Sequence, residues 1–279
     1  MLVIGAIHGN EKCGAIAINR ALGEFDAGKL RIAKGQVTFI PVCNPRAHEE
    51  DRRFVERNLN RYLVPMENPD SYEARLGNIL CPLFAACNAL LDIHSYTIGG
   101  DPFISYDGHT PEEREFAKAI GAPILITGWG EVYEKMGKGR ATSTEEATGG
   151  PQYARRFGAA AVTLECGQHK DPKAPDIAYQ GILNALRHFE MLAEDAGGKG
   201  KPPPSPKHVH MTHVFYRDEG GELAKNWKNF APVKKGAVLA TYSGGKNIIA
   251  EADGFVILPK PDCPTGEEWF YFGMEKSAV

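Results

Sequence analysis

Short apolar runs that alternate with helical patterns constrain the fold of this chain more than any other feature. The runs 2–7, 36–43, 89–93, 123–127 and 160–165 are rich in branched aliphatic residues, and longer segments separate them. Short strands of this kind are buried on both faces, and helices between consecutive strands provide that cover. The sequence therefore predicts an α/β domain with helices on both faces of its sheet.

Helix signals lie between the apolar runs. A helical pattern begins around Glu11, residues 72–88 look helical, and residues 176–194 form an amphipathic pattern with one apolar side. The segment Thr110-Pro111-Glu112-Glu113 has a capping threonine, a proline at the first helical position and a glutamate three residues after the cap. We expect a helix to begin there.

A glycine- and proline-rich stretch, GGKGKPPPSP at 197–206, divides the chain. Consecutive prolines after glycines are typical of a semi-rigid linker. Beyond it, residues 207–279 contain short strand candidates separated by glycine turns. We therefore predict an α/β domain over 1–196, which is the catalytic domain if the chain is an enzyme, a linker over 197–206 and a small β-domain over 207–279.

Composition excludes several classes of partner. The net charge is −3, so the chain has no basic surface for nucleic acid. No stretch approaches the roughly 20 apolar residues of a membrane helix, and the N-terminal run lacks the basic region of a secretory signal. The six cysteines form no CxxC pair, which favours a reduced, cytoplasmic setting. Because the chain begins directly at its first strand, we also expect an element that precedes this strand in relatives to be absent.

Unusual polar residues stand at the ends of three of the apolar runs. His8-Gly9-Asn10-Glu11 follows the first, Asp92-Ile93-His94 ends another, and Glu165 ends a third. Sites in open α/β sheets form at the carboxyl ends of strands, and imidazole together with carboxylate suits zinc. Structural alternatives stay open: a first-turn acid for Glu11, a core histidine for His94 and an ion pair for Glu165.

These residues resemble the motifs of the succinylglutamate desuccinylase/aspartoacylase family, which is related to the zinc carboxypeptidases. The resemblance spans 1–195 and includes further motifs in the family's order. The motifs are His8-Gly9-Asn10-Glu11, Asn44-Pro45-Arg46-Ala47, Arg53, Asn58-Leu59-Asn60-Arg61, Asp92-Ile93-His94 and Leu164-Glu165-Cys166-Gly167. The resemblance implies a mixed sheet of the zinc carboxypeptidase type with helices on both faces.

The resemblance also implies roles. His8, Glu11 and His94 are the expected ligands of one Zn²⁺, with a fourth position left for water. Glu165 is the expected general base, and Arg53 is expected to polarise the scissile carbonyl. Asp92 lies on the same strand face as His94; it either supports a ligand histidine or is structural.

Arginines supply the predicted substrate contacts. Asn60 and Arg61 match the pair that holds a substrate carboxylate in the family, a task that suits the planar guanidinium. For a second acidic group, Arg155 is the better match, and which of Arg155 and its neighbour Arg156 points inward stays open. Without the resemblance, arginines 53, 57 and 61 fit one face of a helix, with nearby glutamates as partners.

The predicted function is a zinc-dependent hydrolase that cleaves the amide bond of an N-acyl amino acid or a similar small amide. Its partner is then a small molecule that carries a carboxylate, and a homo-oligomer is left open. Two alternatives remain: a zinc carboxypeptidase acting on peptides, and a non-catalytic binding protein that retains the fold. The histidine cluster at 208, 210 and 213 is interpreted as a surface feature rather than a metal site.

Overall fold

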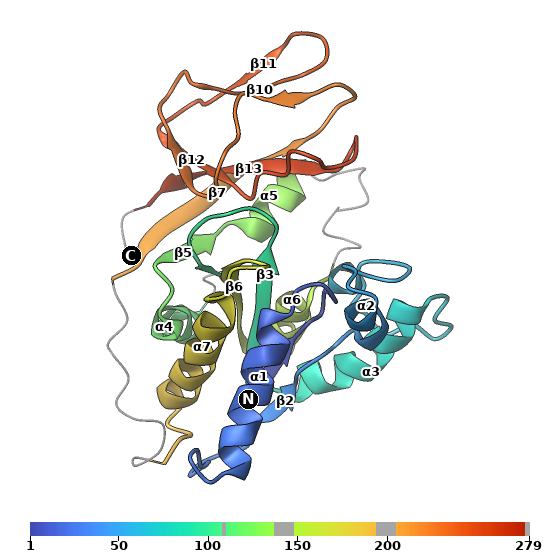
Figure 1. The fold of residues 1–279 in the computed structure, drawn as a ribbon, viewed down its shortest axis with the longest axis vertical. Coiled ribbons are helices and arrows are strands. Elements are labelled where there is room, and N and C mark those ends of the chain that lie inside the picture. The colour runs from blue at the N-terminus through green and yellow to red at the C-terminus, as the bar shows by residue number, and fades with distance from the viewer. Residues whose placement is uncertain (108–109, 137–147, 194–204, 277–279) are drawn as a thin grey trace.

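One mixed sheet of ten strands organises the computed structural model, which describes residues 1–107, 110–136, 148–193 and 205–276 (Figure 1). In chain order the strands are β1 (Leu2–Gly5), β2 (Thr38–Ile40), β3 (Ala89–Tyr96), β4 (Phe103–Ser105), β5 (Ile124–Thr127), β6 (Ala160–Gln168), β7 (Lys207–Tyr216), β9 (Ala231–Val233), β12 (Gly254–Ile257) and β13 (Glu268–Glu275). Across the sheet their order is β2-β1-β3-β6-β4-β5-β7-β13-β12-β9.

The strands run in both directions. β1 is parallel to β2 and β3, and β3 is parallel to β6. β4 is antiparallel to β6 but parallel to β5, so the direction reverses in the middle of the sheet. The mixed α/β sheet predicted from the sequence is therefore confirmed. The sequence did not indicate β4 or β9, each of which has three residues, too few to show a pattern.

Helices cover both faces of the sheet (Figure 1). α1 (Cys13–Asp26), α4 (Pro111–Ile120) and α7 (Ala174–His188) share one apolar core with the sheet. α3 (Tyr72–Ala86) and α6 (Gly150–Arg155) share a second core, near the short α2 (Pro45–Glu49). Alternate residues of β1 enter the two cores, as the two-residue period of a strand requires. At the predicted start of α4, the Thr110 hydroxyl accepts a hydrogen bond from the backbone N–H of Glu113.

The C-terminal region is rich in strands and extends the main sheet. β7 pairs in parallel with β5, and β13, β12 and β9 follow outward. A separate three-stranded sheet contains β8 (Glu222–Leu223), β10 (Val238–Thr241) and β11 (Asn247–Ile249). Most of the predicted linker, 197–204, lies outside the described residues. Within the described ranges no helix is long and apolar enough to cross a membrane.

Candidate active site

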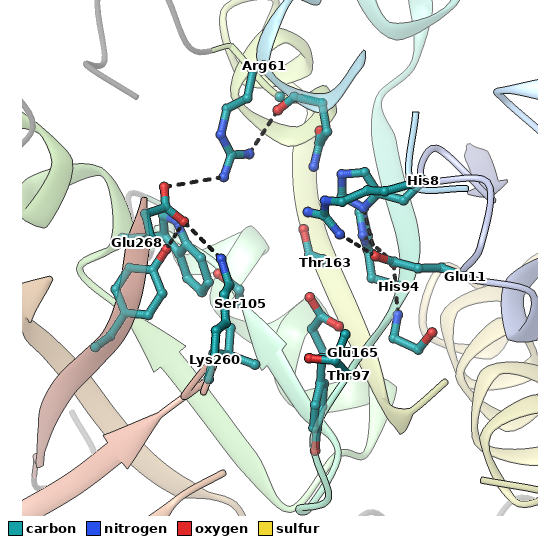
Figure 2. A pocket seen from close by; sticks show the side chains of 18 of the residues that line it. His8, Glu11, Arg61, His94, Thr97, Ser105, Thr163, Glu165, Lys260 and Glu268 are labelled. Carbon is teal, nitrogen blue, oxygen red and sulfur yellow. Dashed lines mark hydrogen bonds and ion pairs between the residues drawn. The ribbon is translucent and has the colours of Figure 1, made fainter. Parts of the chain in front are cut away.

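A cavity with a volume of about 590 Å³ lies where the carboxyl ends of β1, β3 and β6 meet the C-terminal region. Its wall contains side chains from segments far apart in the sequence. Figure 2 shows the group His8, Glu11 and His94 on one side and the contact between Arg61 and Glu268 on the other. The position agrees with the rule that sites in α/β sheets form outside the carboxyl ends of strands.

A buried His–Glu–His group stands at one end of this cavity. The Glu11 carboxylate bridges the two imidazoles: Oε1 lies 2.8 Å from His8 Nδ1, and Oε2 lies 3.0 Å from His94 Nδ1. One ligand atom from each residue lies within 4.8 Å of the others. The turn before Glu11 needs glycine at position 9, because a Cβ there would stand 2.1 Å from the carbonyl carbon of Ala47.

The outer nitrogens of the two histidines have partners of their own. His8 Nε2 lies 3.0 Å from Asn58 Oδ1, and His94 Nε2 lies 2.9 Å from Asp92 Oδ2. Oxygen partners on Nε2 orient an imidazole so that Nδ1 faces a metal. The backbone N–H of Ser95 also donates to Glu11 Oε2 at 3.0 Å. Asp92 therefore contacts the His94 ring at the nitrogen that does not face Glu11.

Burial and neighbouring charges set the protonation of the group in the absence of a metal. Burial, followed by the charge of Arg53, lowers the pKa of His8 to about 3. Burial opposes the charged form of His94, but Asp92 and Glu11 outweigh it and raise its pKa. Burial likewise opposes ionisation of Glu11, yet the two histidines lower its pKa. Glu11 is thus anionic and His8 neutral, as metal ligation requires, whereas His94 is protonated and must lose its proton when a metal binds.

The chemistry of these donors fits a divalent cation. Two imidazole nitrogens and one carboxylate form one of the ligand sets that catalytic zinc sites use. All three residues are at most 3% exposed, so bulk water would compete little with them for a bound cation. In the described part of the chain, no other three His, Cys, Asp or Glu residues gather closely enough to hold a metal ion.

Glu165 lies beside the group. It is the register partner of His94 on the neighbouring strand β6, and its side chain lines the same cavity. Its Oε2 is buried and has no hydrogen-bond partner among the described residues. Burial raises the pKa of Glu165 to about 8, opposed by the charge of His94. Such a carboxylate has a free oxygen and a high affinity for a proton.

The arginine-rich segment 44–61 is not one helix, which corrects the helix-face alternative for arginines 53, 57 and 61. α2 ends at Glu49, and helical structure returns only in a short 3-10 turn at Leu59–Arg61. The buried carboxylate of Glu73 organises the loop between them by accepting backbone N–H bonds from Val55, Glu56 and Arg57 at 2.7, 3.1 and 3.2 Å. The hydrogen bonds to the Glu73 carboxylate thus take the place of the backbone hydrogen bonds that a helix would have made in this segment.

We expect Glu73→Gln to destabilise the fold by about 2 kcal/mol, because an amide cannot accept all of these bonds and leaves buried N–H groups unpaired. Burial opposes the Glu73 charge, but the backbone bonds lower its pKa, so its stabilisation persists at neutral pH and is lost on acidification. Urea unfolding of the variant measures the effect. The exposed Glu67→Gln serves as control, and equal stability of both variants would contradict the role of Glu73.

The other predicted residues of this segment lie in the cavity wall. Arg53 donates from one terminal nitrogen to Glu11 Oε1 at 2.9 Å. Asn60 Oδ1 accepts from the backbone N–H of Gly150 at 3.2 Å and so attaches the loop to α6. Arg61 extends to the far side, 3.9 Å from Glu268 Oε1. Arg53 thus stands next to the His–Glu–His group and Arg61 away from it.

Arg155 does not line the cavity, which differs from its predicted place. Its guanidinium donates to Glu113, Asp107 and the backbone carbonyl of Ala161 at 2.9, 2.7 and 2.6 Å. Glu113 is buried, so Arg155 neutralises an acid within the fold. Its neighbour Arg156 is the residue in the cavity wall, where it donates to the Thr148 hydroxyl at 2.9 Å. The sequence could not separate the two adjacent arginines.

A polar cluster from the second half of the chain was not predicted. Glu268 Oε1 accepts from the Tyr133 hydroxyl at 2.8 Å, and Oε2 accepts from Tyr271 at 2.5 Å and lies 3.5 Å from Lys260. Although burial opposes it, Arg61 and then Lys260 lower the pKa of Glu268 to about 2. These residues come from α5 (Trp129–Met136) and from the C-terminal region, and no spacing in the sequence connects them.

His169 also lines the cavity, with Nδ1 at 2.8 Å from the Ser95 hydroxyl. The C-terminal histidines lie elsewhere. His213 stacks on Phe215 with ring centroids 5.9 Å apart, and neither His208 nor His210 lines this cavity. Of the histidines outside the motif positions, only His169 among the described ones therefore belongs to this cavity.

Comparison with known proteins identifies the family of the chain. The α/β fold with a mixed sheet and a C-terminal β region defines its structural class. The catalytic-domain profile of the succinylglutamate desuccinylase/aspartoacylase family matches residues 1–189. The chain belongs to the succinylglutamate desuccinylase/aspartoacylase family, which confirms the resemblance seen in its motifs.

Individual relatives are distant. A probable aspartoacylase of Parasynechococcus marenigrum is 29% identical over 138 residues, which are 45% of this chain and 45% of that protein. The chain thus matches less than half the length of this relative. A succinylglutamate desuccinylase of Shewanella denitrificans is 24% identical over 94% of this chain and 77% of its own. The solved structure of the ectoine utilization protein EutE (DoeB) from Ruegeria pomeroyi superposes with a TM-score of 0.75 at 20% identity, over 98% of this chain and 84% of that one.

Proposed function

We propose that this chain is a zinc-dependent deacylase that hydrolyses the amide bond of an N-acyl amino acid. The observation that carries the proposal is the position of Glu165, a buried carboxylate with a free oxygen, on the strand next to His94. His8, Glu11 and His94 would hold the zinc. Family membership and the names of the relatives support hydrolysis of an acylated amino acid.

A zinc ion bound there supplies Lewis-acid polarisation and lowers the pKa of water. The rest of the chemistry belongs to the protein. Glu165 takes the proton from the attacking water and returns it to the departing amine. Burial raises the pKa of Glu165 to about 8 without a metal, so this carboxyl can hold the proton that it takes and give it up again near neutral pH.

Arg53 is the proposed stabiliser of the charge that develops on the carbonyl oxygen. Its guanidinium already lies 2.9 Å from Glu11 and retains further N–H groups that are not in that bond. A fixed donor next to the reaction centre stabilises an oxyanion without reorganising during the reaction. Arg53 is 44% exposed at its side chain, so a bound substrate would also shield it from water.

Arg61 and Asn60 are the proposed anchors for a substrate carboxylate, on the side of the cavity away from the metal ligands. The Arg61 guanidinium donates to the backbone carbonyl of Asn60 at 3.0 Å, and Figure 2 shows it directed toward Glu268. Tyr133 and Glu268 hold it in place, so little entropy remains to be lost when a carboxylate binds. We propose Arg156, in place of Arg155, for a second acidic group.

We expect Arg61→Ala to raise KM for an N-acyl amino acid about 10- to 100-fold with little change in kcat, because a charged hydrogen bond to a part of the substrate that does not react contributes about 1.5–3 kcal/mol to binding. Steady-state kinetics check this. Arg57→Ala is the matched control, since Arg57 pairs with Asp70 and does not line the cavity. An unchanged KM in Arg61→Ala would remove Arg61 from the substrate site.

The test of the proposal is turnover by zinc-loaded protein, measured as release of free amine. The panel contains N-acyl amino acids with monocarboxylic and dicarboxylic acyl groups, and a short peptide. Clear preference for an N-acyl amino acid supports the deacylase. Preference for the peptide would favour the carboxypeptidase, and inactivity on the whole panel with zinc bound would favour a binding protein.

A further inference from the structure

A second cavity, of about 210 Å³, lies along β5 and β7 and shares no lining residue with the larger one. Two histidines of β7 face it, each beside its register partner on β5: His208 opposite Leu125, and His210 opposite Thr127. The alternation of His208 and His210 puts both imidazoles on one face of the strand. The proposed deacylase function makes no use of these residues.

The histidines present hydrogen-bond donors to the cavity. Nδ1 of His210 lies 3.0 Å from the Thr127 hydroxyl. When that hydroxyl donates, the proton of the neutral ring is on Nε2, which becomes a donor. Nε2 is 3.8 Å from the nearest carboxylate oxygen, on Glu131, which is beyond hydrogen-bond distance. An acceptor in the cavity can therefore accept a hydrogen bond from the Nε2–H of His210.

Positive charge exceeds negative charge around these rings. Arg114 and Lys276 line the cavity together with two acids. Asp107 is 2.7 Å from Arg155, which also pairs with the buried Glu113, and Glu131 is 3.5 Å from Lys135. With Arg114 and Lys276, four cations therefore stand against three acids among these residues.

Burial and the nearby cations also affect the pKa values of the two histidines. Burial, followed by the charges of Lys118 and Arg114, lowers the pKa of His208, and burial followed by the charge of Lys276 lowers that of His210.

We propose that this cavity binds a phosphate group, through His208, His210, Arg114 and Lys276. A phosphate offers several acceptor oxygens to donors that line the cavity from β7, from α4 and from Lys276, which follows β13, and its charge offsets the excess of cations. A metal ion is the poorer fit, because within the described residues the cavity gathers no three ligand atoms close together. The inference stands independently of the deacylase proposal, since it uses a separate cavity.

The test is titration of the full chain with inorganic phosphate at constant ionic strength. Calorimetry measures Kd, and NMR follows the assigned imidazole resonances of His208 and His210. We expect both resonances to move in a saturable way, and both imidazole pKa values to rise. Arg114→Gln should weaken binding at least tenfold, as should the exposed Lys276→Gln. His213→Asn, on the same strand but outside the cavity, should leave Kd unchanged.

Three further arms identify the ligand. The Arg61→Gln variant should bind as the wild type does, which separates this cavity from the larger one. Glycerol phosphate with an affinity similar to that of inorganic phosphate would show that the cavity accepts a phosphomonoester, and binding of inorganic phosphate alone would restrict it to the free ion. An equal response to chloride, or no saturable shift of either histidine, would overturn the proposal.

Discussion

Glu165→Gln is expected to lower kcat for amide hydrolysis roughly a thousandfold while zinc stays bound, because a general base contributes about 10²- to 10⁴-fold to such a reaction. The amide side chain has nearly the same shape but cannot accept the proton of water. Glu165 is not one of the three residues whose ligand atoms converge, so the metal content should not fall. Steady-state kinetics and metal analysis on the same preparation measure the two effects.

The control for this variant is Glu267→Gln, since Glu267 also lines the cavity but is exposed. We expect its activity to stay close to that of the wild type.

A second measurement on Glu165→Gln is the pH dependence of its stability without metal. Glu165 ionises in the unfolded chain near pH 4.5 but only near 8 in the fold, so wild-type stability falls as the pH rises between these values. Glu165→Gln should lack this slope, and activity near the wild-type level would refute the general-base role.

His94→Ala is expected to abolish stoichiometric zinc binding, and activity with it, because two protein ligands are too few for a catalytic zinc site. Asp92→Asn is a second variant, for which we expect a partial loss of zinc affinity. Its side chain lies 2.9 Å from His94 Nε2 and orients the ring without being one of the ligands. Loss of such a partner costs about 10- to 100-fold in metal affinity.

Competition with a chromophoric chelator measures both affinities for zinc. His94→Ala with wild-type affinity would refute this ligand. Asp92→Asn with unchanged affinity would make Asp92 a structural residue, which is the alternative that the sequence left open.

The sequence was sufficient wherever one segment carries both the fold signal and the chemistry. The strand run and the HGNE turn lie together, so the position of His8 and Glu11 could be read directly. The same holds for His94, two residues before the end of β3, and for the capped start of α4. In each case a short apolar pattern and local turn or cap residues place the residue in its element, and distant partners such as Asn58 for His8 then orient the side chain.

The sequence was insufficient where a distant residue decides the geometry. Nothing local shows that Glu73, on α3, organises the loop after α2 and prevents a helix there. The choice between Arg155 and Arg156 depends on the buried acid Glu113 of α4, which captures the first of them. Glu268 meets Arg61 only because the C-terminal strands extend the main sheet.

The measurement that tests the central claim most directly is metal analysis of purified wild type, Glu165→Gln and His8→Ala after incubation with zinc, followed by turnover of an N-acyl amino acid. A catalytic site of three protein ligands predicts about one zinc per chain in the wild type and in Glu165→Gln, little in His8→Ala, and turnover only in the wild type. Absence of zinc from all three proteins, or equal turnover with and without zinc, would contradict the account.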